Sequence, residues 1–261
     1  MLKYELMIVV NRRTSDMPSV FLSPSTQEYN PYVNGGNEEQ YMNLIADAIE
    51  PYLQASGIDY RRNDPSLTVG GSVRLSNQYR PDLHLAIHSN AAPEYLSGAI
   101  QGTDVYYYPG SQAGRAYADR IVRVMEEIYP YPELVGASPN GGLYELRESQ
   151  APAVLIEVAY HDNPEDAGWI KANVETIARA LARATADALG VPFVDPGAAR
   201  PAQVATPGFA VNLRSRPAWD APAIAVVPNR TQVQLLSEEN GWYQLRVNGM
   251  TGYINAQYIL E

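Results

Sequence analysis

The chain has 261 residues, 46% of them hydrophobic, and a formal net charge of −10 at pH 7. This length and apolar content support a buried core in one large domain or in two smaller ones. The negative charge argues against non-specific nucleic-acid binding, which needs a surplus of Lys and Arg. The sequence contains no cysteine, so a metal would need His, carboxylate, amide or water ligands.

The beginning of the sequence predicts neither a membrane span nor an ordinary signal peptide. Its apolar patch at residues 6–10 is much shorter than the roughly 18 residues of a spanning helix, and Asn-Arg-Arg follows it. We expect residues 1–17 to be an N-terminal extension without a secretion leader, or a misassigned start with Met17 as the natural one.

The first predicted element is a short strand at residues 19–22, which Ser-Pro ends. A helix is predicted from Asn37, with Glu38 and Glu39 at the positive end of its dipole, and Gly57 ends it. We assign its apolar stripe to Tyr41, Leu44, Ile45, Ala48, Ile49 and Tyr52. A second strand at residues 58–61 and a short helical segment are expected next.

The segment PDLHLAIHSNAA, residues 81–92, predicts a buried strand. Leu83, Leu85 and Ile87 would share one face, and His84, Ala86 and His88 the other. At a rise of about 3.3 Å per residue, the two histidines lie about 13 Å apart along the strand, too far to share one metal ion. His88 falls at the carboxyl end of the strand, where ligands bind in open α/β sheets.

Further along the chain we expect a strand at residues 103–108, a helix at 111–128, a central apolar strand at 152–160 and a helix from 163 to about 189. This alternation indicates an α/β fold at residues 18–191, with a mostly parallel sheet covered by helices on both faces. Residues 192–203, rich in Pro and Ala, are predicted to be a linker. Residues 204–261 contain short strands separated by turn signals, which predicts a small all-β barrel.

Three polar residues are expected at one edge of the sheet: Glu39, His88 and Glu157. Two hard ligands and a carboxylate base are the groups that a zinc-activated water requires. Glu39 alone could be a helix-dipole carboxylate and His88 a satisfied core residue, as we expect for His84. Glu157 lies inside an apolar strand, where an unpaired carboxylate costs several kcal/mol, so it needs a cation or a metal nearby.

Four ordered motifs carry a family resemblance across residues 18–190: SVFLSPSTQE, EQYMNLIADAI, AIHSNAA and LYELRESQAPAVLIEVAYHDNPED. Together they resemble the zinc-dependent N-acetylmuramoyl-L-alanine amidases of bacterial autolysins and phage lysins. The resemblance implies Glu39 and His88 as zinc ligands and Glu157 as the catalytic carboxylate. It implies a peptidoglycan hydrolase that cleaves the amide between N-acetylmuramic acid and L-alanine of the stem peptide. Asn90 is an expected substrate contact.

The sequence departs from the family at the first motif, where the family carries a histidine ligand after Pro-Gly and this chain has Ser25-Thr26. Glu28 from the same loop is the first substitute, with Gln27 or His161 as the others. His161 could instead contact the substrate or cap a loop. If no side chain replaces the ligand, the chain would be a non-catalytic pseudo-amidase that binds the cell wall. A metal amidohydrolase acting on small amides is a further alternative.

Residues 204–260 resemble a bacterial SH3-like domain, through VNLRSRP and ENGWYQLRVNGMTGYINAQYI. The resemblance implies anchoring to peptidoglycan. Trp219, in a turn beside Asp220, is the expected groove residue, whereas we expect Trp242 and Tyr253 to be packing residues. We expect the protein at the bacterial cell wall or outside the cell after release, and in the cytoplasm until lysis because no signal peptide is evident. No nucleic-acid partner and no membrane span are expected, and the oligomeric state stays open.

Overall fold

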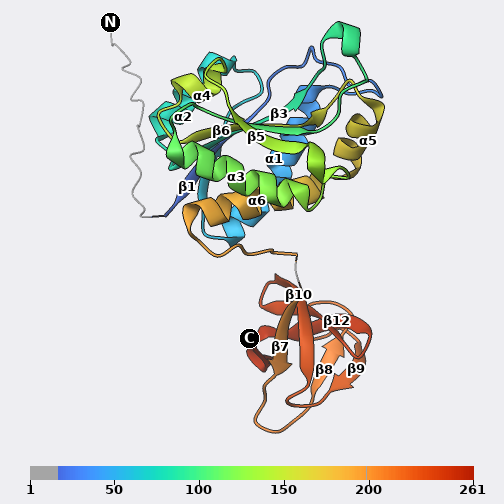
Figure 1. Cartoon of the computed structure of the whole chain (residues 1–261). Helices are drawn as coiled ribbons and strands as arrows, with labels where there is room; N and C mark the ends of the chain where they lie inside the picture. Colours follow the sequence, from blue (N-terminus) through green and yellow to red (C-terminus); the bar gives the residue numbers. More distant parts are fainter. Residues whose placement is uncertain (1–16, 198) are drawn as a thin grey trace, which may run out of the picture. The chain divides into compact units, whose positions relative to one another are not determined.

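The computed structural model describes residues 17–197 and 199–261, so the predicted extension lies outside the described residues except for Met17. The chain divides after Val194 into two compact units, which we describe separately (Figure 1). This division falls within the segment predicted to be a linker, residues 192–203.

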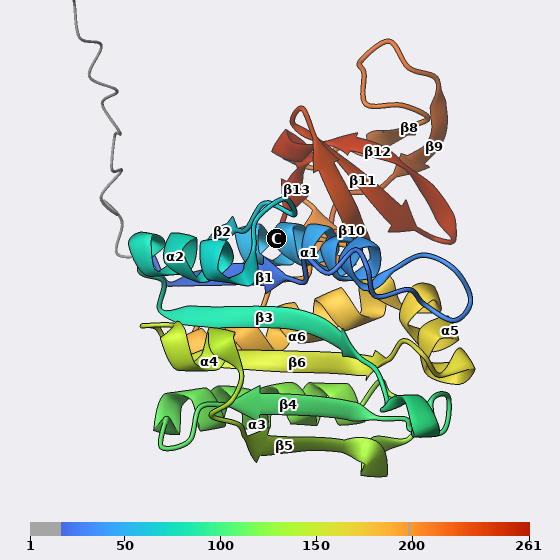
Figure 2. The same ribbon diagram turned by 90° about the horizontal axis from the view of Figure 1, so that it is seen from above.

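The first unit is built on a six-stranded sheet with the order β2-β1-β3-β6-β4-β5 (Figure 2). Neighbouring strands are parallel except for β4 and β6, which are antiparallel. The prediction of a mostly parallel sheet is confirmed, although the sequence did not predict the edge strand β5. The strands are β1 (Ser19–Pro24), β2 (Asp59–Arg62), β3 (Leu83–Asn90), β4 (Thr103–Tyr107), β5 (Val135–Pro139) and β6 (Ala153–Tyr160).

Helices cover both faces of this sheet (Figure 1). The larger layer consists of α1 (Glu38–Ala55), α3 (Gln112–Glu126) and α6 (Val174–Leu189), and the opposite face carries α2 (Val69–Tyr79) and α4 (Tyr144–Glu148). The remaining elements are α5 (Pro164–Ala172) and the 3-10 turns η1 (Glu94–Leu96) and η2 (Pro132–Leu134). No helix within residues 17–197 and 199–261 is both long enough and apolar enough to cross a membrane.

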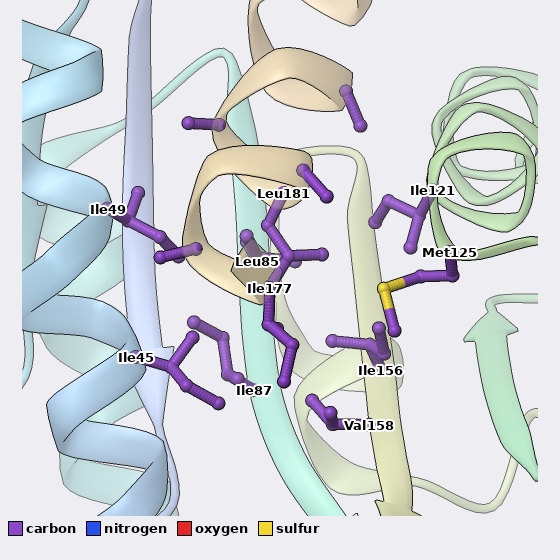
Figure 3. Packing of buried hydrophobic residues seen from close by; sticks show 14 of the residues in the cluster. Ile45, Ile49, Leu85, Ile87, Ile121, Met125, Ile156, Val158, Ile177 and Leu181 are labelled. Atoms are coloured by element: carbon purple, nitrogen blue, oxygen red, sulfur yellow. The ribbon is translucent and has the colours of Figure 1, made fainter. Parts of the chain in front are cut away.

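The main core lies between the sheet and the larger helix layer (Figure 3). Apolar side chains of α1, α3 and α6 pack there on the alternate side chains of β3 and β6. The labelled members are Ile45, Ile49, Leu85, Ile87, Ile121, Met125, Ile156, Val158, Ile177 and Leu181. The other side chains of β3 and β6 face α2 and α4, where a much smaller apolar cluster leaves room for polar groups.

The buried stripe of α1 differs from the one expected. Leu44 is 42% exposed, whereas Met42, Ile45, Ile49 and Leu53 are fully buried. Ile45, Ile49 and Tyr52 are buried as expected, so the buried face is turned by less than the 100° that separates successive residues of a helix. Extending it backwards from Ile45 and Met42 by seven and four residues reaches Glu38, which is buried as well.

The single helix predicted for residues 163–189 is instead two helices. Asn173 ends α5 with φ −124° and ψ 20°, outside helical geometry, and α6 begins directly after it. Its side-chain amide donates to the Trp169 carbonyl at 2.8 Å, which satisfies a carbonyl at the end of α5. Asparagine favours such local side-chain bonds over a helix interior, and this explains the break.

The second unit is an all-antiparallel sheet with the order β13-β7-β10-β11-β12-β8-β9, as the small all-β prediction requires. Asn248 and Gly249, both at positive φ, form the predicted two-residue hairpin turn between β11 and β12. The first strand begins at Arg200, inside the segment predicted to be a linker. The elements of the second unit are β7 (Arg200–Val204), β8 (Val211–Arg214), β9 (Ala223–Val227), β10 (Gln232–Glu239), β11 (Trp242–Val247), β12 (Met250–Asn255), η3 (Ala256–Tyr258) and β13 (Ile259–Leu260).

Candidate active site

Polar side chains gather at one edge of the first unit, where β1, β3 and β6 end. In the strand register His88 of β3 is paired with Glu157 of β6, and Glu157 is paired with Asp104 at the start of β4. Because side chains alternate along strands, these three residues share the face that α2 and α4 cover. This edge is the place where open α/β sheets bind ligands.

Glu38, rather than Glu39, meets His88 at this edge. Glu38 is 1% exposed, and its Oε1 lies 2.9 Å from His88 Nδ1. Its Oε2 accepts a 2.6 Å hydrogen bond from Asn30 Nδ2. Glu39 is partly exposed, and its backbone carbonyl accepts a hydrogen bond from Asn43 Nδ2 at 2.8 Å. The sequence analysis chose Glu39 from the resemblance of the second motif, whereas the helical spacing from the buried residues Met42 and Ile45 leads to Glu38.

The charges of Glu38 and His88 support each other. Burial alone would raise the pKa of Glu38, but the hydrogen bond and the charge of His88, with Asn30, hold that pKa below its ordinary value. Burial opposes the charged form of His88, yet its pKa is well above the ordinary value because Glu145 and Glu38 flank the ring. In the absence of a metal the pair is therefore an ion pair.

Of the three substitutes expected for the missing histidine, Gln27 lies at this pair. Its Nε2 is 3.4 Å from His88 Nδ1 and 3.5 Å from Glu38 Oε1. Its backbone N–H donates to Ser25 Oγ at 3.2 Å, which anchors the loop. Glu28 is exposed. The structure thus places Gln27, and not Glu28, beside Glu38 and His88.

His161 lies next to this group but is engaged elsewhere. Its ring is buried, and Nδ1 donates to the Ser89 carbonyl at 2.8 Å. The imidazole also stacks on the Tyr32 ring, with centroids 5.4 Å apart and an interplanar angle of 17°. Its recorded contacts therefore join the end of β6 to the end of β3.

Glu157 is the buried carboxylate that the sequence singled out. Its Oε2 is buried and accepts no hydrogen bond from any described residue. Burial, with added repulsion from Glu38 and Asp104, raises the pKa of Glu157 to about 7 against the opposing charge of His88. This carboxyl can therefore both release and take up a proton near neutral pH.

Asn90 contributes to the site through Asp104. Its Nδ2 donates to Asp104 Oδ2 at 3.2 Å, and the Tyr160 hydroxyl donates to the same oxygen at 3.2 Å. Asp104 is in turn the strand partner of Glu157. Asn90 and Tyr160 therefore fix a second carboxylate beside Glu157.

A further buried carboxylate, Glu145 of α4, was missed by the sequence reasoning. Its Oε2 lies 3.0 Å from His84 Nε2, and its Oε1 accepts from Ser23 Oγ at 3.2 Å and lies 3.9 Å from His88 Nε2. Although burial would raise it, the pKa of Glu145 falls to about 2 because His84 and His88 face it. One carboxylate in a five-residue helix carries no periodic signal, so the sequence alone did not reveal it.

A cavity of about 410 Å³ opens beside these groups. Gln27, Tyr29, His88 and Glu145 line it together with residues 67–69 and other side chains of the β2–α2 connection. The cavity brings a ligand-sized space to both His88 and Glu145.

The donor set limits how a metal ion could be held. Across residues 17–197 and 199–261, no group of three His, Asp or Glu side chains is arranged to hold one. Glu38 and His88 could supply two donors, and a third protein donor would have to be of another kind. The side-chain amide of Gln27 is in place for this role.

In the second unit Trp219 is 56% exposed. Its ring makes an edge-to-face contact with Trp242, with centroids 4.8 Å apart, and lies 6.4 Å from the Tyr258 ring. Phe209, 48% exposed, contacts Tyr258 at 5.8 Å. Trp242 is 5% exposed and is therefore a packing residue, whereas Trp219 and Phe209 present aromatic surface.

Comparison with solved structures shows that the fold of the first unit is shared with bacterial amidases. The amidase AmiC2 of Nostoc punctiforme matches with a TM-score of 0.58 and 20% identity, over 66% of this chain and 97% of that one. The catalytic domain of CwlV from Bacillus (Paenibacillus) polymyxa matches with a TM-score of 0.57 and 21% identity, over 67% of this chain and 100% of that one.

Sequence comparison finds relatives that are also named N-acetylmuramoyl-L-alanine amidases. LytC, an N-acetylmuramoyl-L-alanine amidase of Bacillus subtilis, is 28% identical over 163 residues, which cover 59% of this chain and 31% of LytC. CwlM, an N-acetylmuramoyl-L-alanine amidase of Bacillus licheniformis, is 26% identical over 185 residues, 67% of this chain and 70% of CwlM. The chain therefore spans about a third of LytC and more than two thirds of CwlM.

Family models match both units. The bacterial SH3 domain model matches residues 210–259. The N-acetylmuramoyl-L-alanine amidase model matches residues 25–189, more than half of the chain, and includes every site residue described in the first unit except Ser23. The chain therefore belongs to the N-acetylmuramoyl-L-alanine amidase family.

Proposed function

We propose that this chain is a peptidoglycan hydrolase that cleaves the amide between N-acetylmuramic acid and L-alanine of the stem peptide. The support is the family match, the names of LytC and CwlM, and one observation in the site. That observation is the pairing of the Gln27, Glu38 and His88 cluster with Glu157, a buried carboxylate whose Oε2 accepts no hydrogen bond from the described residues. We place the enzyme at the bacterial cell wall.

The cluster fits a zinc ion by its dimensions. Ligands about 2.0–2.1 Å from a tetrahedral zinc lie about 3.3 Å from one another. Glu38 Oε1 lies 2.9 Å from His88 Nδ1. Gln27 Nε2 lies 3.4 Å from His88 Nδ1 and 3.5 Å from Glu38 Oε1. Only the amide oxygen can bind a cation. The side-chain amide of Gln27 would therefore rotate by about 180° about its Cγ–Cδ bond, which exchanges its nitrogen and its oxygen. Bound zinc supplies polarisation of a carbonyl and a more acidic water.

Glu157 is the proposed proton carrier. With a pKa of about 7 its carboxylate takes a proton from the attacking water and, once protonated, gives it to the nitrogen of the leaving amine. Burial of Oε2 without a partner keeps this oxygen available for the transfer. The negative charge of Asp104, the strand partner of Glu157, disfavours ionisation of Glu157. Asn90 donates a hydrogen bond to Asp104 and is also the proposed substrate contact.

The second unit is the proposed wall-binding module. Its exposed aromatic pair, Trp219 and Phe209, offers flat apolar faces of the kind that sugar rings and peptides cover on binding. Trp219 is the residue whose loss should reduce binding to sacculi.

The test of the function combines metal content with product analysis. Glu38→Ala should lose about one zinc per chain, whereas Glu39→Ala, the matched control one residue away, should keep it. Wild-type protein should release stem peptides that begin with L-alanine from purified sacculi. Binding to sacculi without such release would favour a pseudo-amidase, and release only from small soluble amides would favour a different amidohydrolase.

A further inference from the structure

A chain of buried polar side chains runs behind His88, on the side away from Glu38. The Oγ atom of Ser76, in α2, lies 2.9 Å from His84 Nδ1. His84 Nε2 lies 3.0 Å from Glu145 Oε2, and Glu145 Oε1 lies 3.9 Å from His88 Nε2. His84 is 0% and Glu145 5% exposed. This series of contacts thus begins at Ser76 in α2 and ends at His88, the candidate metal ligand.

His88 therefore lies between two carboxylates, one at each ring nitrogen. Glu38 is at Nδ1, at 2.9 Å, and Glu145 is in front of Nε2. Nε2 is buried, and within the described part of the chain it has no hydrogen-bond partner. At 3.9 Å the contact with Glu145 is an ion-pair distance, about 1 Å longer than a hydrogen bond, so a small turn of the ring would close it.

The two nitrogens cannot have the same role when an ion is bound. A neutral imidazole that gives the lone pair of Nδ1 to a metal carries its proton on Nε2. Histidine ligands almost always donate that second N–H to an outer group, often a carboxylate, which fixes the tautomer and the ring orientation. Glu145 is the group that faces Nε2, and its own position is fixed by His84 and Ser23.

We propose, on the basis of the function proposed above, that Glu145 is the positioning residue for His88. It accepts the Nε2 proton and thereby holds Nδ1 toward Glu38 and Gln27. His84, with the Ser76 hydroxyl donating to its Nδ1, acts one step further back by holding the Glu145 carboxylate. The two histidines of β3, which cannot bind one metal together, act in sequence through one carboxylate.

Zinc affinity, measured by competition with a chelator on the full chain, tests the proposal. Glu145→Gln should weaken zinc binding about 10- to 100-fold, the range seen for loss of an outer partner of a ligand. The control is Asp166→Asn, which changes another buried carboxylate, one that accepts from Gly102 and Tyr160 and has no recorded contact with His88. It should keep wild-type zinc affinity. Equal affinity in Glu145→Gln and wild type, or an equal loss in both variants, would overturn the proposal.

A second variant separates positioning from general packing. His84→Gln should weaken zinc binding in the same direction but less, and the double variant with Glu145→Gln should bind zinc no more weakly than Glu145→Gln alone. Additive losses would mean that His84 and Glu145 act independently, against the proposed sequence of contacts. Helical circular dichroism on each variant checks that the first unit is folded.

Nitrogen NMR gives a readout that does not depend on zinc. The sequence contains three histidines, so the His88 signals can be assigned by their loss in His88→Gln. A protected His88 Nε2 proton should be present in the metal-free and zinc-loaded wild type and lost from both forms of Glu145→Gln. An Nε2 proton that is absent from wild type or unaffected by Glu145→Gln would refute the proposal. Wild-type protein that binds no zinc but shows the expected proton would instead refute the metal-dependent function and leave this contact standing.

Discussion

Replacing Glu157 with Gln should make the metal-free protein more stable relative to wild type as the pH rises. The pKa of Glu157 is raised from 4.5 to about 7 in the folded chain. An acid whose folded pKa is raised loses stability between its unfolded and folded pKa values, because the unfolded chain releases the proton first. The interval of about 2.5 pH units, at 1.36 kcal/mol per unit, corresponds to about 3 kcal/mol.

The assay is denaturant unfolding of metal-free wild type and Glu157→Gln between about pH 4 and pH 8. The helical circular-dichroism signal reports on the first unit, since the six α-helices found among the described residues all lie there. The difference in free energy of unfolding between the two proteins should grow in favour of the variant from about pH 4.5, and level off above about pH 7. A difference that does not change with pH would refute the account of Glu157 as a buried carboxylate without a partner.

Glu38→Gln provides a control of opposite sign within the same site. The pKa of Glu38 is lowered, chiefly because His88 and Asn30 outweigh its burial. Its contribution to stability is therefore present above the unfolded pKa and is lost as the pH falls through the folded one. Glu38→Gln should be less stable than wild type at neutral pH, and the gap should close on acidification.

Four further outcomes are expected. Glu157→Gln should lower kcat on peptidoglycan by about 10²- to 10⁴-fold with zinc binding retained, and normal turnover in this variant would remove Glu157 from the mechanism. Gln27→His should tighten zinc binding by about tenfold, or about 1.4 kcal/mol, since imidazole is a better zinc ligand than an amide, and weaker binding would argue against Gln27 at the metal. Chelator treatment should abolish hydrolysis and added zinc restore it. Trp219→Ala should reduce retention on sacculi without changing hydrolysis of soluble muramyl peptides; unchanged retention would exclude Trp219 from the binding surface.

The sheet and its main helices could be predicted from the sequence because their signals are local. Alternation placed β3 with His88 at its carboxyl end, and the apolar run from Ala153 placed β6 with Glu157 inside it. The antiparallel pairing of β4 with β6 and the edge strand β5 were not predictable in this way, since pairing depends on contacts between distant segments.

The site was only partly predictable, for reasons that differ from residue to residue. Glu38 and Glu39 are adjacent, and choosing between them required the helical phase of α1, which Leu44 obscured by being apolar yet exposed. Gln27 and Glu28 differ by one residue in a loop without periodicity. Glu145 comes from a five-residue helix, and its role depends on contacts with two strands.

The most direct test of the central claim is mass spectrometry of the products that zinc-loaded full-length protein releases from purified sacculi. The account predicts stem peptides with a free N-terminal L-alanine, together with glycan strands whose muramic acid carries a free lactyl carboxyl group. It also predicts that Glu157→Gln releases both products at least about a hundredfold more slowly. Cleavage at a glycosidic bond or within the stem peptide, or release by Glu157→Gln at the wild-type rate, would contradict it.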